Sequence, residues 1–310
     1  MSVKIPESSM RILQHVAAES GTSLADLTKN YEDEFYSDFV QADPQLKTDD
    51  DRHNYCAIKV QSDMLLRPKQ SLRKIIPIGH EAPRLTQRNK TKRSTLYVIE
   101  QASDGFKFRR ATCSGDIAEV YQKADPFIMY DVLAGQYSNS QDLALDERSK
   151  FDSGASIGRT PAEFMDIAAK SFNWQRIKIA DAKVNPSRMI RTGSRQFVDT
   201  LDWRIVRGFI SDLGSGLRDD GTEWGRYTLS DETVSGPPVV LPDGRILYPG
   251  LSTWISPWLM KWGKNSVCDF YGSIALDRDK SGKILQPSHA TMNTYQLLPV
   301  YGRELPKSGV

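Results

Sequence analysis

Residues 202–213 read Asp-Trp-Arg-Ile-Val-Arg-Gly-Phe-Ile-Ser-Asp-Leu, a run rich in β-branched and aromatic side chains. Such a run is typical of a strand. The Asp220-Gly221 turn signal follows it, and residues 227–230 continue as a second strand, so the stretch predicts a β-hairpin. Further strand-like runs predict a small barrel over residues 173–310; they lie at 176–184, 245–248, 267–276 and 295–300. Trp254, Trp258 and Trp262 recur at helical spacing and predict a helix between the later strands.

The same order of elements precedes this region. Strand-like runs lie at 72–78, 96–100, 106–112, 127–134 and 142–145, and residues 111–123 contain a short helical pattern. Strand, strand, strand, short helix, strand is the order of the OB-fold, a five-stranded Greek-key barrel. We therefore predict two OB-fold-like five-stranded barrels, at 69–150 and 173–310. A linker and one helix, which begins at Thr160-Pro161, fill residues 151–172.

The first 68 residues have a different texture. Apolar residues between 12 and 17 share one helical face, Ser23 is a helix-capping residue, and Pro68 ends the last helical run. The segment predicts a small acidic helical domain, so the whole chain is mainly β with a helical N-terminal domain. Two roles stay open for it: binding a protein partner, or packing on the first barrel.

Charge alternates along the chain. The 310 residues carry 41 Lys and Arg against 39 Asp and Glu, a net charge of +2. Residues 67–110 nevertheless carry a net +9 and residues 171–210 a net +5, whereas residues 1–66 carry −6. Either the basic strands face acidic elements of the same molecule, or two basic strips attract a polyanion.

No catalytic, cofactor or metal signature is present. The three Cys and four His are scattered, without a zinc-ligand spacing. Residues 277–288 copy the start of a calcium loop, but Ser288 stands where the bidentate Glu belongs, so we read a hairpin turn. We predict a protein that is not an enzyme and holds no cofactor. A metal-dependent nuclease stays open as a minor alternative, because its carboxylates need not be close in sequence.

No apolar run reaches the roughly 20 residues of a membrane helix, and the first residues lack an apolar signal core. We therefore expect no membrane partner and a cytoplasmic location, nucleoid-associated if the ligand is DNA.

Cations interleave with aromatic residues in the basic regions. Single-strand binding needs both, since cations follow the phosphates while aromatic rings stack on bases. In residues 106–110, Phe and basic side chains alternate, so the Phe pair lies either outward as a stacking platform or inward as core. The predicted contacts are Arg88, Lys92, Arg93, Phe106, Phe108, Arg110, Arg191, Arg195, Trp203, Arg207, Trp224 and Tyr227.

The chain resembles the replication protein A-like single-stranded DNA-binding proteins, especially archaeal forms. The resemblance lies in residues 202–210, the Asp219-Asp220-Gly221-Thr222 turn, and residues 227–233 and 267–274. It implies sequence-tolerant binding of single-stranded DNA in a groove shared by two OB-folds, which protects strands in replication or repair. The chain departs from the family in lacking zinc-finger ligands. It also lacks the Gly-rich, acidic-ended tail of bacterial single-strand binding proteins.

Two alternatives remain. RNA rather than DNA stays open as the ligand, because stacking and phosphate contacts do not read the sugar. The protein is instead a structural or assembly subunit of a viral particle or larger complex if the barrels act only as scaffolds.

Overall fold

The computed structural model describes residues 3–65, 70–85, 92–114, 124–136, 142–146, 149–192, 195–219, 221–234, 239–240, 246–247, 249–278, 284, 289–302 and 304–305. The chain divides into two compact units. One comprises Met1–Gln70 with Gly135–Ser140, and the other Ser71–Ala134 with Gln141–Val310.

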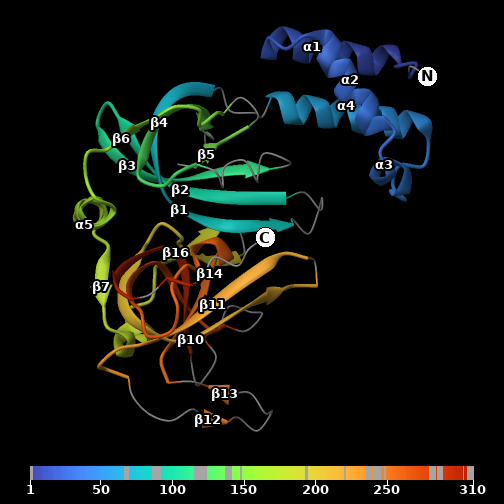
Figure 1. The fold of residues 1–310 in the computed structure, drawn as a ribbon. Helices are drawn as coiled ribbons and strands as arrows, with labels where there is room; N and C mark the ends of the chain where they lie inside the picture. The colour runs from blue at the N-terminus through green and yellow to red at the C-terminus, as the bar shows by residue number, and fades with distance from the viewer. Residues whose placement is uncertain are drawn as a thin grey trace. The chain divides into compact units, whose positions relative to one another are not determined.

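The first unit is helical. Its helices are α1 (Glu7–Ser20), α2 (Leu24–Phe35), α3 (Asp38–Ala42) and α4 (Asp49–Leu65) (Figure 1). Gly21 ends α1 in the left-handed conformation at φ 68°, and Ser23 caps α2 by accepting a hydrogen bond from the Asp26 amide. Leu13, Leu27 and Tyr31 are fully buried between the helices. The prediction that the N-terminal segment is helical is thus confirmed.

The first barrel begins the second unit. Its strands are β1 (Gln70–Leu85), β2 (Lys92–Ala102), β3 (Gly105–Ser114), β4 (Ile128–Gln136) and β5 (Leu143–Ala144). They pair in the order β1-β2-β3-β5-β4, and β4 pairs again with β1, which closes the barrel. β3 and β5 run parallel. A short helix was predicted within residues 111–123. Residues 111–114 continue β3, and residues 115–123 lie outside the described residues.

The second barrel repeats this topology. Its strands are β10 (Arg204–Leu217), β11 (Glu223–Ser230), β14 (Leu251–Ile255), β15 (Val267–Leu276) and β16 (Ala290–Tyr301). The order is β10-β11-β14-β16-β15, closed by β10, and β14 and β16 run parallel. The chain is therefore mainly β with a few helices, as the sequence predicted, and the two large sheets share one strand order.

Shorter elements surround the barrels. They are β6 (Gly154–Ser156) beside β4, α5 (Pro161–Ser171), β7 (Gln175–Ile177) beside β10, η3 (Ile179–Lys183), the hairpin of β8 (Met189–Thr192) and β9 (Arg195–Val198), the hairpin of β12 (Val239–Val240) and β13 (Ile246–Leu247), and η4 (Pro257–Leu259).

Two predicted elements are corrected here. The predicted strand at 176–184 is mostly the 3-10 helix η3. The predicted helix at 254–262 is the end of β14 followed by η4, because burial in β14 alternates with period two.

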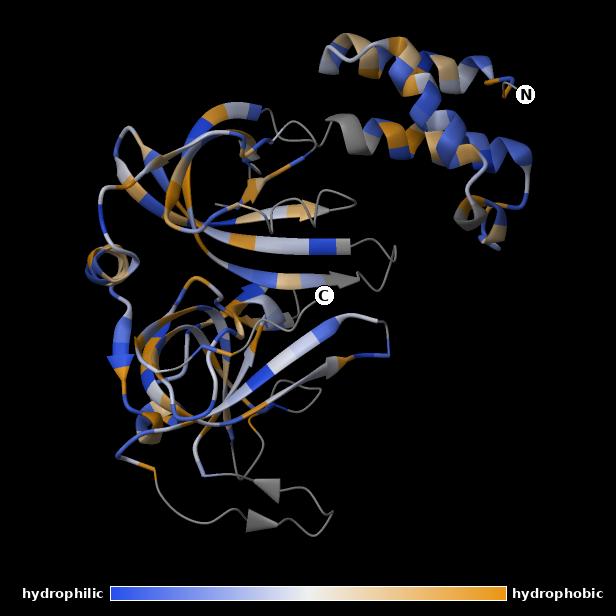
Figure 2. Ribbon diagram, viewed as in Figure 1, coloured by the Kyte–Doolittle hydropathy of each residue, from blue (hydrophilic) through white to orange (hydrophobic). Residues whose placement is uncertain are grey.

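Apolar residues form a separate core inside each barrel. Ile75, Val98 and Val132 are fully buried within the first barrel, and Val206, Leu229 and Phe270 within the second. Figure 2 shows hydrophobic segments recurring along the strands of both barrels and polar segments interspersed between them.

A third core joins the two barrels, and it is aromatic. Tyr97 and Phe108 of the first barrel pack with Trp203 and Tyr295 of the second, and Trp174, which lies between α5 and β7, completes the cluster. The ring centroids of Tyr97 and Tyr295 are 4.2 Å apart, and those of Phe108 and Trp203 are 4.8 Å apart. This cluster makes the two barrels one compact unit.

The close approach of the barrels depends on a glycine. A Cβ atom on Gly79 of β1 would lie 2.6 Å from the backbone oxygen of Tyr295 on β16. One residue earlier, the Ile78 carbonyl accepts a hydrogen bond of 2.9 Å from Nε2 of the Gln296 side chain. Only a residue without a side chain lets these two strands lie so close.

Among the described residues, no helix is long and apolar enough to cross a membrane. No group of three or more His, Cys, Asp or Glu side chains in those same ranges is placed to hold a metal ion.

Candidate nucleic-acid interface

Two tryptophans lie on the outer face of the second barrel. Along β11, Tyr227 and Leu229 point inward, so Trp224 and Arg226 point outward. Arg226 is the register partner of Trp254 on β14, which places all three side chains on one face. The indole rings of Trp224 and Trp254 meet edge to face with centroids 5.7 Å apart. Trp254 remains 40% exposed to solvent.

Two glycines give Trp224 its place. Gly214 and Gly216 of β10 are the register partners of Arg226 and Trp224. A Cβ atom on Gly216 would lie 3.1 Å from the indole ring of Trp224. The ring therefore lies directly against the β10 backbone, which holds it in place beside the hairpin turn that follows β10.

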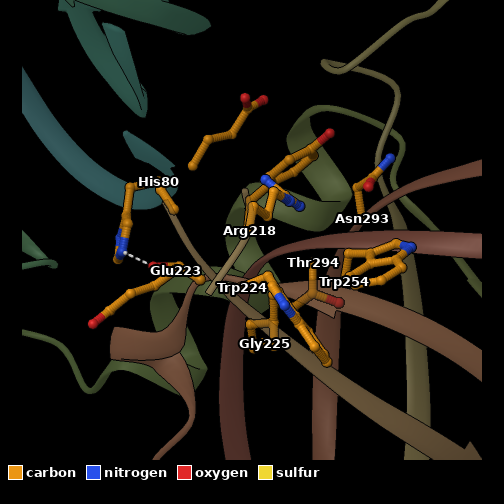
Figure 3. A pocket seen from close by; sticks show the side chains of 13 residues that line it. His80, Arg218, Glu223, Trp224, Gly225, Trp254, Asn293 and Thr294 are labelled. Atoms are coloured by element: carbon orange, nitrogen blue, oxygen red, sulfur yellow. Dashed lines mark hydrogen bonds between the residues drawn. The ribbon is translucent and has the colours of Figure 1, made fainter. Parts of the chain in front are cut away.

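A pocket opens beside these rings. It is lined by the end of β1 on one side and by β11, β14 and β16 on the other. Figure 3 shows Arg218, Asn293 and Trp254 gathered at one side of it and His80 and Glu223 at the other. The lining side chains are His80, Glu81, Ala82, Arg218, Glu223, Trp224, Trp254, Ile255, Ser256, Asn293, Thr294 and Tyr295, with the backbone of Gly225.

His80 joins the barrels at the edge of this pocket. Its Nε2 lies 3.2 Å from the hydroxyl of Ser256, and its ring centroid lies 5.8 Å from that of Trp258. Burial lowers the pKa of His80 to about 4, and the nearby Lys261 ammonium contributes in the same direction. The imidazole is therefore neutral at physiological pH.

Several cations lie on the outer face beside the pocket. Arg226 and Lys264 share the single carboxylate of Asp212, at 3.9 and 2.9 Å. The buried Nε of Arg226 has no hydrogen-bond partner in the described part of the chain. Arg218 lies exposed in the turn after β10.

Many cations of the two basic regions are already paired. Arg73 and Arg109 both bind the buried carboxylate of Glu100. Arg207 binds Asp269 through two hydrogen bonds of 2.8 Å. Burial tends to raise the pKa of Asp269, but the hydrogen bonds from Arg207 and from a second arginine hold it below its usual value. In the described residues, then, several arginines of the basic regions form ion pairs with carboxylates of the same chain.

Several predicted contact residues lie elsewhere than expected. Trp203 and Tyr227 are fully buried and Phe108 is 9% exposed, so we correct their assignment as base-stacking residues. The face that carries Phe106 and Phe108 is outside the barrel, but the joining core covers Phe108, whereas Phe106 is 57% exposed.

The predicted cations differ in their surroundings. Arg110 binds Asp142 at 2.7 Å and the hydroxyl of Thr200 at 3.2 Å, and Arg207 binds Asp269. Arg93 on β2 and Arg191 on β8 are exposed. Arg88 lies outside the described residues, and only the backbones of Lys92 and Arg195 are described, on β2 and β9. Of the predicted residues whose side chains are described, Trp224 alone lines the pocket.

Sequence reasoning missed Trp254, Arg218 and Asn293. The period-two pattern of residues 251–255 carried the signal for Trp254, because Leu251, Thr253 and Ile255 point inward and leave Trp254 outward. Nothing in the sequence brings Asn293 to the same place, since it comes from β16 through a parallel pairing.

Comparisons with known proteins show no match to a family model and none to a curated protein. Solved structures do match. A replication protein A heterotrimer bound to single-stranded DNA aligns at 13% identity with a TM-score of 0.38, over 72% of this chain and 49% of that chain. The present chain thus spans about half the length of that chain.

Two further matches are similar in extent. The HINa domain of Ifi202 in complex with 20 bp double-stranded DNA aligns at 10% identity and a TM-score of 0.31, over 76% of this chain and 100% of that one. The single-stranded DNA binding protein from Thermus aquaticus aligns at 12% identity and a TM-score of 0.21, over 78% and 98%.

Proposed function

We propose that this protein binds single-stranded nucleic acid on the outer face of its second barrel, without catalysing a reaction. One observation carries the proposal: Trp224 and Trp254 point outward from β11 and β14, the second and third strands of a closed OB-type barrel. OB barrels bind oligonucleotides on the face of these two strands and in the adjoining loops. Arg218, in the turn between the first and second strands, lies beside the same face.

The exposed ring of Trp254, beside the partly buried ring of Trp224, is a surface that a ligand can cover. A tryptophan that is 40% exposed leaves apolar area in water, which is unfavourable unless a partner buries it. A stacked base provides such a cover, and each stacked base contributes about 1–3 kcal/mol with little dependence on sequence. The cations that share Asp212, together with Arg218, supply the salt-dependent part of the affinity.

The proposed stacking face belongs to the second barrel alone, although β1 of the first barrel lines the pocket beside it. In the first barrel, the outer face of the second and third strands carries Tyr97, Ile99 and Phe108. That face is covered by the aromatic core that joins the barrels. We therefore expect an affinity that stops rising once the oligonucleotide spans a single OB barrel, at about 4–16 nucleotides.

The biological role that we propose is the protection of single strands in replication or repair. DNA is the first candidate ligand, and RNA remains the second, because stacking and phosphate contacts do not read the 2′-hydroxyl. Strand cleavage with Mg²⁺ would contradict the proposed absence of catalysis and would favour the nuclease alternative.

The test is a titration of intrinsic tryptophan fluorescence with a thymidine oligonucleotide of about 30 nucleotides, at about 50 and about 300 mM salt. We expect quenching that weakens with salt and is not matched by duplex DNA. Trp254→Ala removes one stacking contact and should weaken binding by about 5- to 150-fold. Phe197→Ala is the matched control, because Phe197 is a 49% exposed aromatic residue on β9, outside the pocket.

The assembly function has its own supporting observation, the internal pairing of the basic regions. If the oligonucleotide neither quenches nor binds, and sedimentation shows stable self-association of the chain alone, the protein is an assembly subunit. Binding that is equal in the wild type and in Trp254→Ala would place the ligand on another surface.

A further inference from the structure

The pocket beside the two indole rings holds more hydrogen-bond acceptors than cations. Two carboxylates, Glu81 and Glu223, line it together with a single cation, Arg218. A site built only for phosphate would have the opposite balance, since phosphate oxygens are themselves negative acceptors. The composition therefore fits the edge of a base better than a backbone phosphate.

Asn293 lies where the edge of a stacked base would come. β14 and β16 run parallel, and Asn293 is the register partner of Trp254, so the two side chains are neighbours on the outer face. Figure 3 shows the Asn293 amide beside the Trp254 ring. Its side chain presents both donors and an acceptor to the edge of a base that stacks on Trp254.

Glu81 is held in the pocket by a buried partner. The hydroxyl of Tyr97, in the core between the barrels, donates a hydrogen bond of 2.6 Å to Oε1 of Glu81. A carboxylate has two oxygens and about four acceptor positions, and this bond uses one of them. Glu223, the first residue of β11, supplies the second carboxylate that lines the pocket.

We propose that this pocket selects bases that carry an exocyclic amino group, such as cytosine and adenine, over thymine or uracil. A carboxylate accepts hydrogen bonds but cannot donate them, so it pairs with an amino group and repels a carbonyl oxygen. Cytosine offers an amino group at the position where thymine offers a carbonyl oxygen. The inference rests on the proposed binding of single strands to the face of Trp224 and Trp254.

The test compares two pyrimidine oligomers that differ mainly in this group. Deoxycytidine and thymidine oligomers of about 15 nucleotides are titrated separately into the protein at a pH of about 7.5, with tryptophan quenching as the readout. We expect the cytidine oligomer to bind about tenfold more tightly. Equal affinities, or tighter binding of the thymidine oligomer, would overturn the inference.

Conservative variants show whether the carboxylates cause the preference. Glu81→Gln and Glu223→Gln keep the side-chain size and an acceptor but add a donor, so each should lower the cytidine-to-thymidine ratio severalfold while the thymidine affinity is kept or improved. Glu232→Gln is the control, because Glu232 is an exposed carboxylate that pairs with Lys178 outside the pocket. A ratio that is unchanged in both pocket variants would also overturn the assignment of these carboxylates.

The two possible failures are distinguishable. If neither oligomer binds, the proposed function itself fails. If the cytidine and thymidine oligomers bind with equal affinity and Trp254→Ala weakens the binding of each, the proposed function is supported and only the base preference fails.

Discussion

His80 couples the junction of the barrels to pH. Its folded-state pKa of about 4 lies below the usual 6.5, because the ring is buried beside Ser256 and Lys261 is close. Between pH 6.5 and 4, the His80 imidazole is therefore protonated in the unfolded chain but neutral in the folded protein. The free energy of unfolding consequently falls as the pH falls through this window. Above pH 6.5 this contribution is fully present.

We expect the His80 contribution to cost about 2 kcal/mol of stability between pH 7 and pH 5. Urea unfolding of the wild type and of His80→Asn at the two pH values measures it, since the variant has no group that titrates there. The loss on acidification should be clearly smaller in the variant. The same loss in both proteins would show that His80 titrates normally.

Gly79 is a residue at which a single methyl group should matter. Its Cβ position lies 2.6 Å from the Tyr295 backbone oxygen, so Gly79→Ala must push β1 away from β16. We expect a destabilisation of about 1–3 kcal/mol, as for overpacked sites. Gly214→Ala is the matched control, because the nearest atom, in the Trp224 ring, would lie 3.9 Å away. Urea midpoints of the two variants should differ; equal midpoints would mean that the strands adjust freely.

At the scale of the element, α5 was predictable from its first residues. Thr160 accepts a hydrogen bond from the Glu163 amide, the Glu163 carboxylate accepts one from the Thr160 amide, and Pro161 opens the helix. Met165 and Ala168 then face the core that joins the barrels. Local chemistry thus positions a helix that supports a tertiary contact.

Removing this cap should loosen α5 without touching the proposed binding face. We expect Thr160→Ala to lower stability by about 1 kcal/mol, because the amides of the first turn lose their acceptor. Oligonucleotide affinity should be unchanged, as measured by fluorescence on the folded protein. Arg159→Ala, one residue before the cap, should leave both quantities unchanged. A loss of affinity in Thr160→Ala would connect α5 to the site.

The tryptophans at 254, 258 and 262 show how an element is misread. Their spacing of four predicted a helix, but the shorter period of β14 decides the structure, because Leu251, Thr253 and Ile255 fill the barrel interior. A spacing of four fits both a helix and a strand with even alternation. Only the pairing of β14 with β11 and β16 resolves the ambiguity.

At the scale of the whole second unit, the two barrels should unfold together. Trp203 is fully buried and contacts Tyr97 and Phe108 of the first barrel. Trp203→Ala should therefore cost about 3–5 kcal/mol and destabilise both barrels at once. Trp258→Ala, at a ring that is 41% exposed, is the milder control. Far-UV circular dichroism and tryptophan fluorescence should report one coincident transition for the unit; separate transitions would show that the barrels are independent.

The sequence by itself determined most of the strands, their turns, the helix caps and the helical N-terminal unit, but not β14 or η3. These features depend on alternation and turn chemistry within about ten residues, which the chain carries locally. Tertiary structure decided which surface is left for a ligand. Arg207 meets Asp269 62 residues away, Arg110 meets Asp142 32 residues away, and Trp203 leaves solvent only because another barrel covers it. Charge pairing and burial depend on distances between segments far apart in the sequence, which local sequence patterns do not contain.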